Sequence, residues 1–174
     1  MLEQPFFDYL TQHGFTTIDA KTLCDIGKII ELPTRHILHH QGEHPESLYW
    51  LNSGLCHSSY LTDGQQEITK ELIYEQEWII PCESMVLDEP IDCLVESLTE
   101  IQLIEIPLAM VANWRKESPH LYLQLLELYS VQQAQKQRFN CLFSAHERWQ
   151  LFQQHFAHLC DKVPHELLRR YLER

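Results

Sequence analysis

The sequence predicts an α+β fold in which an antiparallel β-sandwich or barrel lies between helical segments. From about residue 31 to residue 106, short runs of alternating apolar residues are separated by turn signals such as Thr62-Asp63-Gly64. After Pro107 the pattern changes, and apolar residues recur at three- or four-residue intervals, which is the period of an amphipathic helix. The chain therefore divides into a mainly β part and a helical part.

The first residues are expected to form a short helical lead-in to the strands. Residues 1 to about 30 place Phe6, Phe7, Leu10 and Phe15 on one side of such a helix. The strand-like runs follow as "ILHH", "LYWL", "LCHSSYL", "EITKELI", "EWII", "LVES" and "IQLIEI". Short strands with Asn, Asp and Gly turns between them are typical of an antiparallel sandwich.

The helical part is expected to begin with one long helix, from Pro119 to about Phe143. Its stripe consists of Leu121, Leu125, Leu128, Gln132, Gln135, Phe139 and Leu142. A stripe of this length predicts a homodimer seam, and packing on the chain's own β half is the alternative. Ser144, with a glutamate three residues later, forms a capping box for a second helix, and Val163-Pro164 begins a third.

Composition and charge narrow the class of protein. The net charge of −12 argues against nucleic-acid binding by this chain, because phosphate contacts need a basic face. Six dispersed cysteines without a CxxC motif fit a reducing compartment, so we expect a cytoplasmic protein. The chain has no run of about 18 apolar residues and no signal-peptide pattern at its start, which argues against a membrane protein.

Four of the eleven histidines lie in "RHILHHQGEH", from Arg35 to His44. If this segment is a strand, His36 and His40 share a face but lie about 13 Å apart, while His39 points to the other face. A zinc ion needs all its ligands within about 2 Å of one point. We therefore expect no metal site and no cofactor here.

The order of these elements, together with four motifs, resembles the Crp/Fnr-type transcription regulators, whose sensor is a cyclic-nucleotide-binding β-roll. The motifs are "HILHHQGEHPESLYWLNSGL", "YLTDGQQEITKELI", "LFSAHERWQLF" and "VPHELLRRYL". The resemblance implies an α+β, mainly β sensor domain: an eight-stranded antiparallel double-stranded β-roll (jelly roll) with an N-terminal helix. A long C-terminal dimerisation helix and short following helices complete it. The implied domains are residues 1–118 (β-roll), 119–143 (dimerisation helix) and 144–174 (a remnant or start of a winged helix-turn-helix domain).

The ligand cassette departs from the family pattern. The family holds a cyclic phosphate with a Gly-Glu pair and a later Arg followed by Ser or Thr, since a phosphate needs a guanidinium and hydroxyl donors. A gapless alignment puts Ile80-Pro81 at the Gly-Glu pair, Ile91 at the Arg and Asp92 at the Ser. The segment "PCESMVLDEPID" contains acids, including Glu83, and neither Arg nor Lys. A phosphate desolvated beside Asp92 without a cation would be strongly disfavoured.

The candidate ligand-binding positions are thus Pro81, Glu83, Ile91 and Asp92, and cAMP or cGMP is not expected to bind there in the family's way. The pocket could be collapsed, or it could hold a neutral or cationic molecule near the two acids. A thiol sensor built on Cys82 or Cys93 is a further alternative, opposed by the simpler reading of both as buried, inert cysteines.

The second departure concerns the output of the regulator. A winged helix-turn-helix needs a recognition helix in the major groove, and Arg174 still lies in what would be the first helix. We expect DNA binding only if a helix-turn-helix follows Arg174. The predicted function is the sensor domain of a Crp/Fnr-like regulator, not an enzyme. The alternatives are a protein-interaction module and a cupin-like metal-dependent enzyme, whose H-x-H motif is missing.

Overall fold

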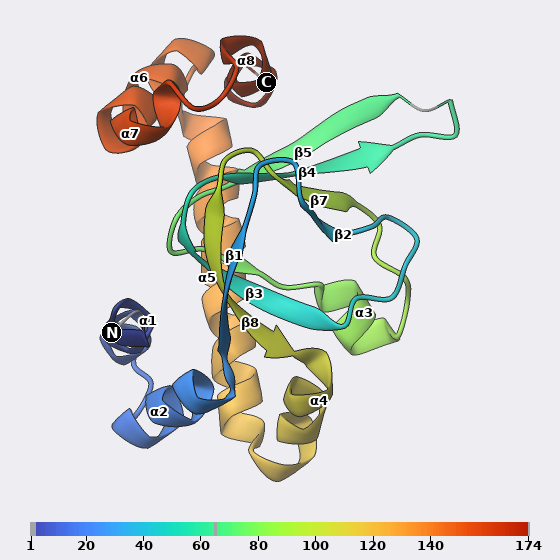
Figure 1. The fold of residues 1–174 in the computed structure, drawn as a ribbon, viewed down its shortest axis with the longest axis vertical. Helices are drawn as coiled ribbons and strands as arrows, with labels where there is room; N and C mark the ends of the chain where they lie inside the picture. Colours follow the sequence, from blue (N-terminus) through green and yellow to red (C-terminus); the bar gives the residue numbers. More distant parts are fainter. Residues whose placement is uncertain (1–2, 65, 174) are drawn as a thin grey trace.

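The computed structural model describes residues 3–64 and 66–173 and confirms the predicted fold class. Within these residues, eight strands form two antiparallel sheets of four strands each. Figure 1 shows the strands beside one long helix, with further helices at both ends of the chain. The expectation that Arg174 belongs to the last helix lies outside the described residues.

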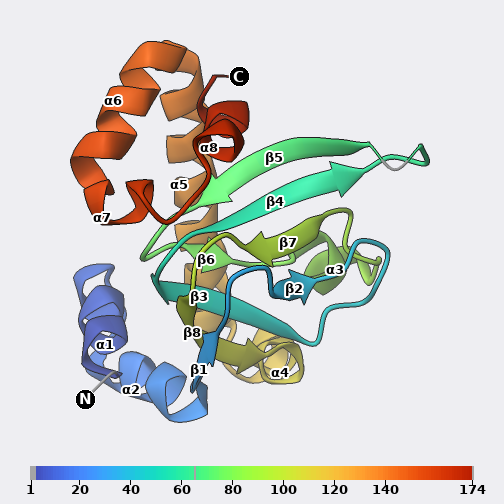
Figure 2. The ribbon, with the colours of Figure 1, turned by 45° about the horizontal axis from the view of Figure 1, so that its top comes forward.

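Each sheet combines strands that are distant in the sequence. The first sheet has the order β1 (Lys28–Leu32), β8 (Ile101–Pro107), β3 (Ser47–Ser53) and β6 (Trp78–Ile79). The second has the order β2 (Ile37–His39), β7 (Leu94–Ser97), β4 (Cys56–Leu61) and β5 (Glu67–Ile73). The β4–β5 hairpin projects beyond the rest of the second sheet in Figure 2. The turn from β3 to β4 requires Gly54, whose φ is 96° and whose added Cβ would lie 2.5 Å from a backbone oxygen.

Strand β3 explains why the two sheets and the helices share a core. Its residues 47–51 are all buried, because both faces of the strand are covered. Leu48 and Trp50 face the helices and pack with Phe6, whereas Tyr49 and Leu51 face the second sheet. The rings of Phe6 and Trp50 lie 4.9 Å apart between centroids. A strand covered on both faces appears in the sequence as a continuous apolar run instead of an alternating one.

Four helices pack on the outer face of the first sheet: α1 (Glu3–Gln12), α2 (Thr17–Ile26), α4 (Leu108–Glu117) and α5 (Pro119–Leu142). The predicted long helix is confirmed as α5. The first part of its stripe packs against the chain itself, since Leu121 and Leu125 are buried in this core and Leu128 packs against it. Leu142, the last member of the stripe, is exposed. The amide of Gln132 also bonds both the backbone N–H and the carbonyl of Trp78, at 2.8 and 2.9 Å.

The last three helices fold back onto the second sheet. They are α6 (Ala145–His155), α7 (Ala157–Cys160) and α8 (His165–Leu172). The predicted capping box is present, with Ser144 and Glu147 bonding each other's backbone N–H groups. Phe152, Leu168 and Leu172 form one buried cluster with residues of the β-roll, and both ribbon views place α8 beside the β4–β5 hairpin (Figures 1 and 2).

Three local expectations were wrong or incomplete. Residues 28–30 are the start of β1 and not the end of a helical lead-in, because they pair with β8. The acidic segment from Glu83 to Asp92 was assigned no helix, but its first half belongs to helix α3 (Cys82–Leu87). Helix α4 fills the interval between Pro107 and Pro119.

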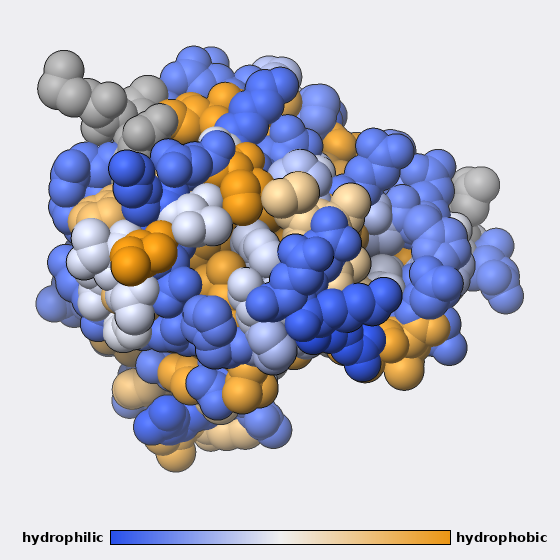
Figure 3. All heavy atoms as spheres, turned by 90° about the horizontal axis from the view of Figure 1, so that it is seen from below, coloured by the Kyte–Doolittle hydropathy of each residue, from blue (hydrophilic) through white to orange (hydrophobic). Residues whose placement is uncertain are grey.

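The apolar patches on the surface and the length of the apolar helices are the two features relevant to contact with a membrane. The face drawn in Figure 3 is mostly hydrophilic, and its apolar residues form small separate patches. Small scattered apolar patches are ordinary for a protein surface. None of the helices in the described part of the chain is long and apolar enough to cross a bilayer.

Candidate functional site

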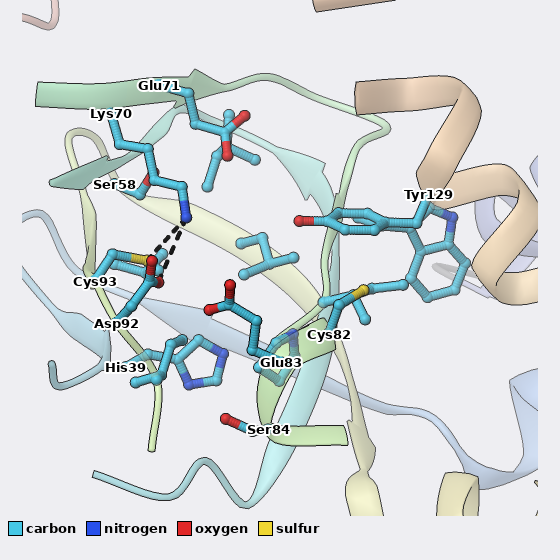
Figure 4. A pocket seen from close by; sticks show the side chains of 17 residues that line it. His39, Ser58, Lys70, Glu71, Cys82, Glu83, Ser84, Asp92, Cys93 and Tyr129 are labelled. Carbon is cyan, nitrogen blue, oxygen red and sulfur yellow. Dashed lines mark hydrogen bonds and ion pairs between the residues drawn. The ribbon is translucent and has the colours of Figure 1, made fainter. Parts of the chain in front are cut away.

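A cavity of about 170 Å³ lies between the β-roll and helix α3. The four positions predicted from the sequence, Pro81, Glu83, Ile91 and Asp92, all line it. Strands β4, β5 and β7 form the opposite wall, and Tyr129 of α5 closes one side (Figure 4). The four positions therefore lie together around one cavity.

The segment that carries these residues is held by backbone hydrogen bonds. Helix α3 ends at Leu87, and the residue that caps it, Asp88, has a left-handed φ of 59°. The chain then runs beside the turn that follows β2. The N–H of Ile91 donates to the carbonyl of Glu43 (2.9 Å), and the N–H of Gly42 donates to the carbonyl of Ile91 (2.8 Å). Gly42 has a φ of 86°, which glycine adopts without strain. The Gly-Glu turn of the histidine-rich segment thus fixes one wall of the cavity.

The cavity contains a cation that the sequence argument missed. Lys70 of β5 extends its ammonium to within 3.5 Å of the Asp92 carboxylate and 3.6 Å of the Cys93 sulfur. Its Nζ also lies 5.2 Å from the centroid of the Tyr60 ring. Burial disfavours the charged ammonium, but the neighbouring groups, Asp92 among them, raise the pKa of Lys70 above its ordinary value. Asp92 was expected to have no cation nearby, and this was wrong, because in the order β7-β4-β5 only strand β4 separates Lys70 from the segment that carries Asp92.

Three buried polar atoms that line the cavity have no hydrogen-bond partner within the described residues. They are Nε2 of His39 and the hydroxyl oxygens of Ser58 and Ser84. The side chains of His39 and Ser58 belong to residues only 4% and 2% exposed. Burial lowers the pKa of His39 to about 4, so its ring is neutral at pH 7. Native proteins seldom leave buried polar groups unpaired.

The two cysteines of the cassette are not activated. Burial raises the pKa values of Cys82 and Cys93 to about 11 each, which keeps both as thiols at neutral pH. This environment is that of a structural cysteine. The histidines of Arg35–His44 do not gather either: in residues 3–64 and 66–173, no three His, Cys, Asp or Glu side chains are grouped so as to hold a metal ion.

A second, larger cavity of about 740 Å³ lies on the other side of β5. Its walls come from β5, α5, α6 and α8, and Lys70 and Glu71 line both cavities. Between them, Lys136 of α5 is paired with Glu71 (2.7 Å) and Glu77 (2.8 Å). Burial opposes the charge on Lys136, but these two carboxylates raise its pKa above the ordinary value. Strand β5 is therefore the common wall between the cassette and the C-terminal helices.

The two sheets, with helix α3 beside a cavity, define the class as a β-roll domain. Sequence comparison gives the family. Residues 29–118, just over half of the chain, match the model of the cyclic nucleotide-binding domain. The chain therefore belongs to the cyclic nucleotide-binding domain family. This family is regulatory and not catalytic. No curated protein sequence matches the chain.

Solved structures share the fold at low sequence identity. The sensor domain of the transcriptional regulator DNR from Pseudomonas aeruginosa has a TM-score of 0.58 and 21% identity, covering 74% of this chain and 85% of that chain. The catabolite activator protein of Thermus thermophilus has a TM-score of 0.60 and 17% identity, with coverages of 78% and 63%. The Toxoplasma gondii PKA regulatory domain, crystallised with cAMP, has a TM-score of 0.56 and 19% identity, with coverages of 62% and 42%. The chain thus spans less than two thirds of the length of the Thermus thermophilus and Toxoplasma gondii chains.

Proposed function

We propose that the chain is the sensor part of a Crp/Fnr-like transcription regulator, and that its cavity takes an effector other than a cyclic nucleotide bound in the family's way. The likeness to the DNR sensor domain and to the catabolite activator protein supports the regulator assignment. Six free cysteines, none of them in a disulfide, fit action in the cytoplasm.

The observation that carries this proposal is the ion pair of Lys70 and Asp92. In the family's cassette, a guanidinium and a hydroxyl would face the phosphate. Here the buried apolar side chain of Ile91 stands at the first position and the carboxylate of Asp92 at the second. A phosphate entering the cavity would have to compete with Asp92 for Lys70 and would remain beside an unpaired carboxylate. Repulsion between like charges at such short range in a partly desolvated site opposes binding.

Strand β5 supports a route from the cavity to the helices. Lys70 faces the cassette, and the next residue, Glu71, holds Lys136 of α5. The buried guanidinium of Arg148 donates to the carbonyls of Asn140 (3.1 Å) and Phe143 (2.6 Å), at the junction of α5 and α6. We infer that an effector that moves β5 changes the orientation of α6 to α8 relative to α5. In a regulator, that change would orient a DNA-binding domain.

The exposed side of α5 supports the homodimer. Leu123, Val131 and Leu142 are 56%, 53% and 68% exposed along this helix of 24 residues. Leu142 belongs to the stripe expected from the sequence, whereas Leu123 and Val131 lie outside it. Leu121 and Leu125 of that stripe are buried in the chain's own core. A second copy offering the same face would cover these side chains in a two-fold interface.

The experiment that tests the proposal is calorimetric titration with cAMP and with cGMP, up to millimolar concentration. The Toxoplasma gondii PKA regulatory domain serves as the positive control because it was crystallised with cAMP. We expect no saturable heat from either nucleotide. Binding at micromolar concentration would overturn the proposal that the effector differs from the family's ligand.

The packing of the C-terminal helices favours a second candidate, a protein-interaction module that lacks DNA output. Tyr171 of α8 and His57 of β4 tie these helices to the β-roll in a buried contact. A regulator's output element needs freedom to move, whereas an interaction module is served by a fixed surface. Native-state hydrogen exchange separates the two candidates. In a regulator, the amides of α6 to α8 should exchange through a local opening that costs less free energy than global unfolding. In a fixed module, they should exchange only when the whole protein unfolds.

A further inference from the structure

The walls of the α3 cavity define what kind of molecule it can receive. It has room for about six water molecules and is smaller than the roughly 300–1,000 Å³ of pockets that take drug-sized ligands. His39 and Ser58, from two different strands, line this space, and each has one buried polar atom without a hydrogen-bond partner in the described residues. A ligand that bonds these atoms gains hydrogen bonds that the protein alone leaves unmade.

The charges around the cavity favour a cation. Three carboxylates line it, and two of them already have a lysine partner: Asp92 pairs with Lys70, and Glu71 pairs with Lys136. The third, Glu83, makes no ion pair or hydrogen bond within the part of the chain that the structure describes. Its carboxylate reaches toward the middle of the cavity in Figure 4. Lys136 is shared with Glu77, so the acids at the cavity outnumber the cations, and the exposed carboxylate of Glu83 is the one without a partner among the described residues.

The remaining groups are compatible with a cation and not with an anion. The ring of His39 is neutral at pH 7 and adds no positive charge. The phenol of Tyr129 points into the cavity from α5 (Figure 4), and its hydroxyl oxygen can accept a hydrogen bond from an ammonium or guanidinium group. An anion would meet Glu83 directly and would find the ammonium of Lys70 already held by Asp92.

We propose that the α3 cavity binds a small organic cation, an amine or guanidinium compound smaller than a nucleotide, with Glu83 as its counter-charge. His39 and Ser58 would bond the polar groups at the other end of the ligand. This inference rests on the proposed function, because it names the effector class of the same sensor cavity.

A four-carbon series of matched size tests the inference: 1,4-diaminobutane as cation, 1,4-butanediol as neutral compound and succinate as anion. Each is titrated into the full chain by calorimetry up to ten millimolar, with thermal melting as a second readout. We expect 1,4-diaminobutane to bind and to raise the melting temperature, butanediol to bind more weakly, and succinate to do neither. Equal or tighter binding of succinate or butanediol would overturn the inference, and so would the absence of binding by 1,4-diaminobutane.

Two variants locate the binding. Glu83→Gln should weaken 1,4-diaminobutane binding by at least about tenfold, since it removes a charge-assisted contact. Glu89→Gln removes an equivalent charge from the same acidic segment outside the cavity lining and should leave binding unchanged. Equal effects of the two variants would mean general electrostatic attraction and would overturn the inference. Micromolar binding of cAMP would instead overturn the proposed function. Binding of neither nucleotide nor diamine would leave that function standing and remove only this inference.

Discussion

The phenol of Tyr171 on α8 hydrogen-bonds the imidazole of His57 on β4, which lies 114 positions earlier in the chain. Both residues are buried, and the carboxylates of Glu96 and Glu67 lie 3.6 and 3.9 Å from the same ring. Burial lowers the pKa of His57, so the ring stays largely neutral at pH 7 despite these acids. This contact fastens the last helix to the β-roll.

Tyr171→Phe should destabilise the protein by about 1–3 kcal/mol, because it removes the hydroxyl bonded to a buried ring nitrogen. Tyr122→Phe is the matched control, since the buried hydroxyl of Tyr122 has no partner in the described residues and its removal should be neutral or slightly stabilising. Urea unfolding followed by circular dichroism measures both. Equal losses in the two variants would contradict the role assigned to Tyr171.

Lys136→Met should cost about 3–5 kcal/mol, because it leaves Glu71 and Glu77 as partly buried carboxylates without their cation. Arg138→Met, at an exposed position two residues along the same helix, should change the unfolding free energy little. Adding Glu71→Gln and Glu77→Gln to Lys136→Met should restore most of the stability. If the triple variant is as unstable as the single one, the loss comes from packing and not from unpaired charge.

The unfolding free energy should fall as the pH drops through the range set by His39. Its pKa is about 4 in the folded protein and about 6.5 when unfolded, so the unfolded chain binds a proton more readily. The stability is fully present above pH 6.5, and roughly 3 kcal/mol of it should be lost on going to pH 4. Carboxylates also titrate here, so the decisive quantity is the difference between variants. The His39→Leu variant should lose less stability over this range than the wild-type protein. The His36→Leu variant, changed at an exposed position, should lose as much as the wild-type protein.

Val131→Glu should convert a homodimer to a monomer without changing the circular dichroism, because it puts a charge on the exposed face of α5. Met110→Glu, at an exposed apolar position on α4, is the control and should leave the mass unchanged. Light scattering at tens of micromolar reports both. A wild-type protein that is monomeric at this concentration would remove the dimer proposal.

Cys141, which is exposed, should react with iodoacetamide well before Cys82 and Cys93 at pH 8. With pKa values of about 11, the two cassette thiols are ionised only to about one part in a thousand at that pH. Peptide mass spectrometry over time measures the three rates. If Cys93 is alkylated as fast as Cys141, a thiol sensor in the cassette becomes the better explanation.

The sequence by itself determined the fold class and the long helix. Turn residues and the helical period are local signals, so α5 and the capping box at Ser144 could be predicted within a residue or two. The positions Pro81, Glu83, Ile91 and Asp92 were predicted because they are close in sequence and follow a known spacing. Their shared cavity follows from that closeness.

Only the tertiary structure decided which groups complete the cavity and which face of α5 is exposed. Lys70, His39 and Ser58 reach the cavity from strands β5, β2 and β4, and antiparallel pairing across a sheet follows no fixed spacing in the sequence. From the sequence, the apolar stripe of α5 could pack on a partner or on the chain's own sheet, because any apolar surface would remove the stripe from water equally well. The buried pair of Tyr171 and His57 depends on the fold in the same way: chain topology, not local pattern, brings its two members together.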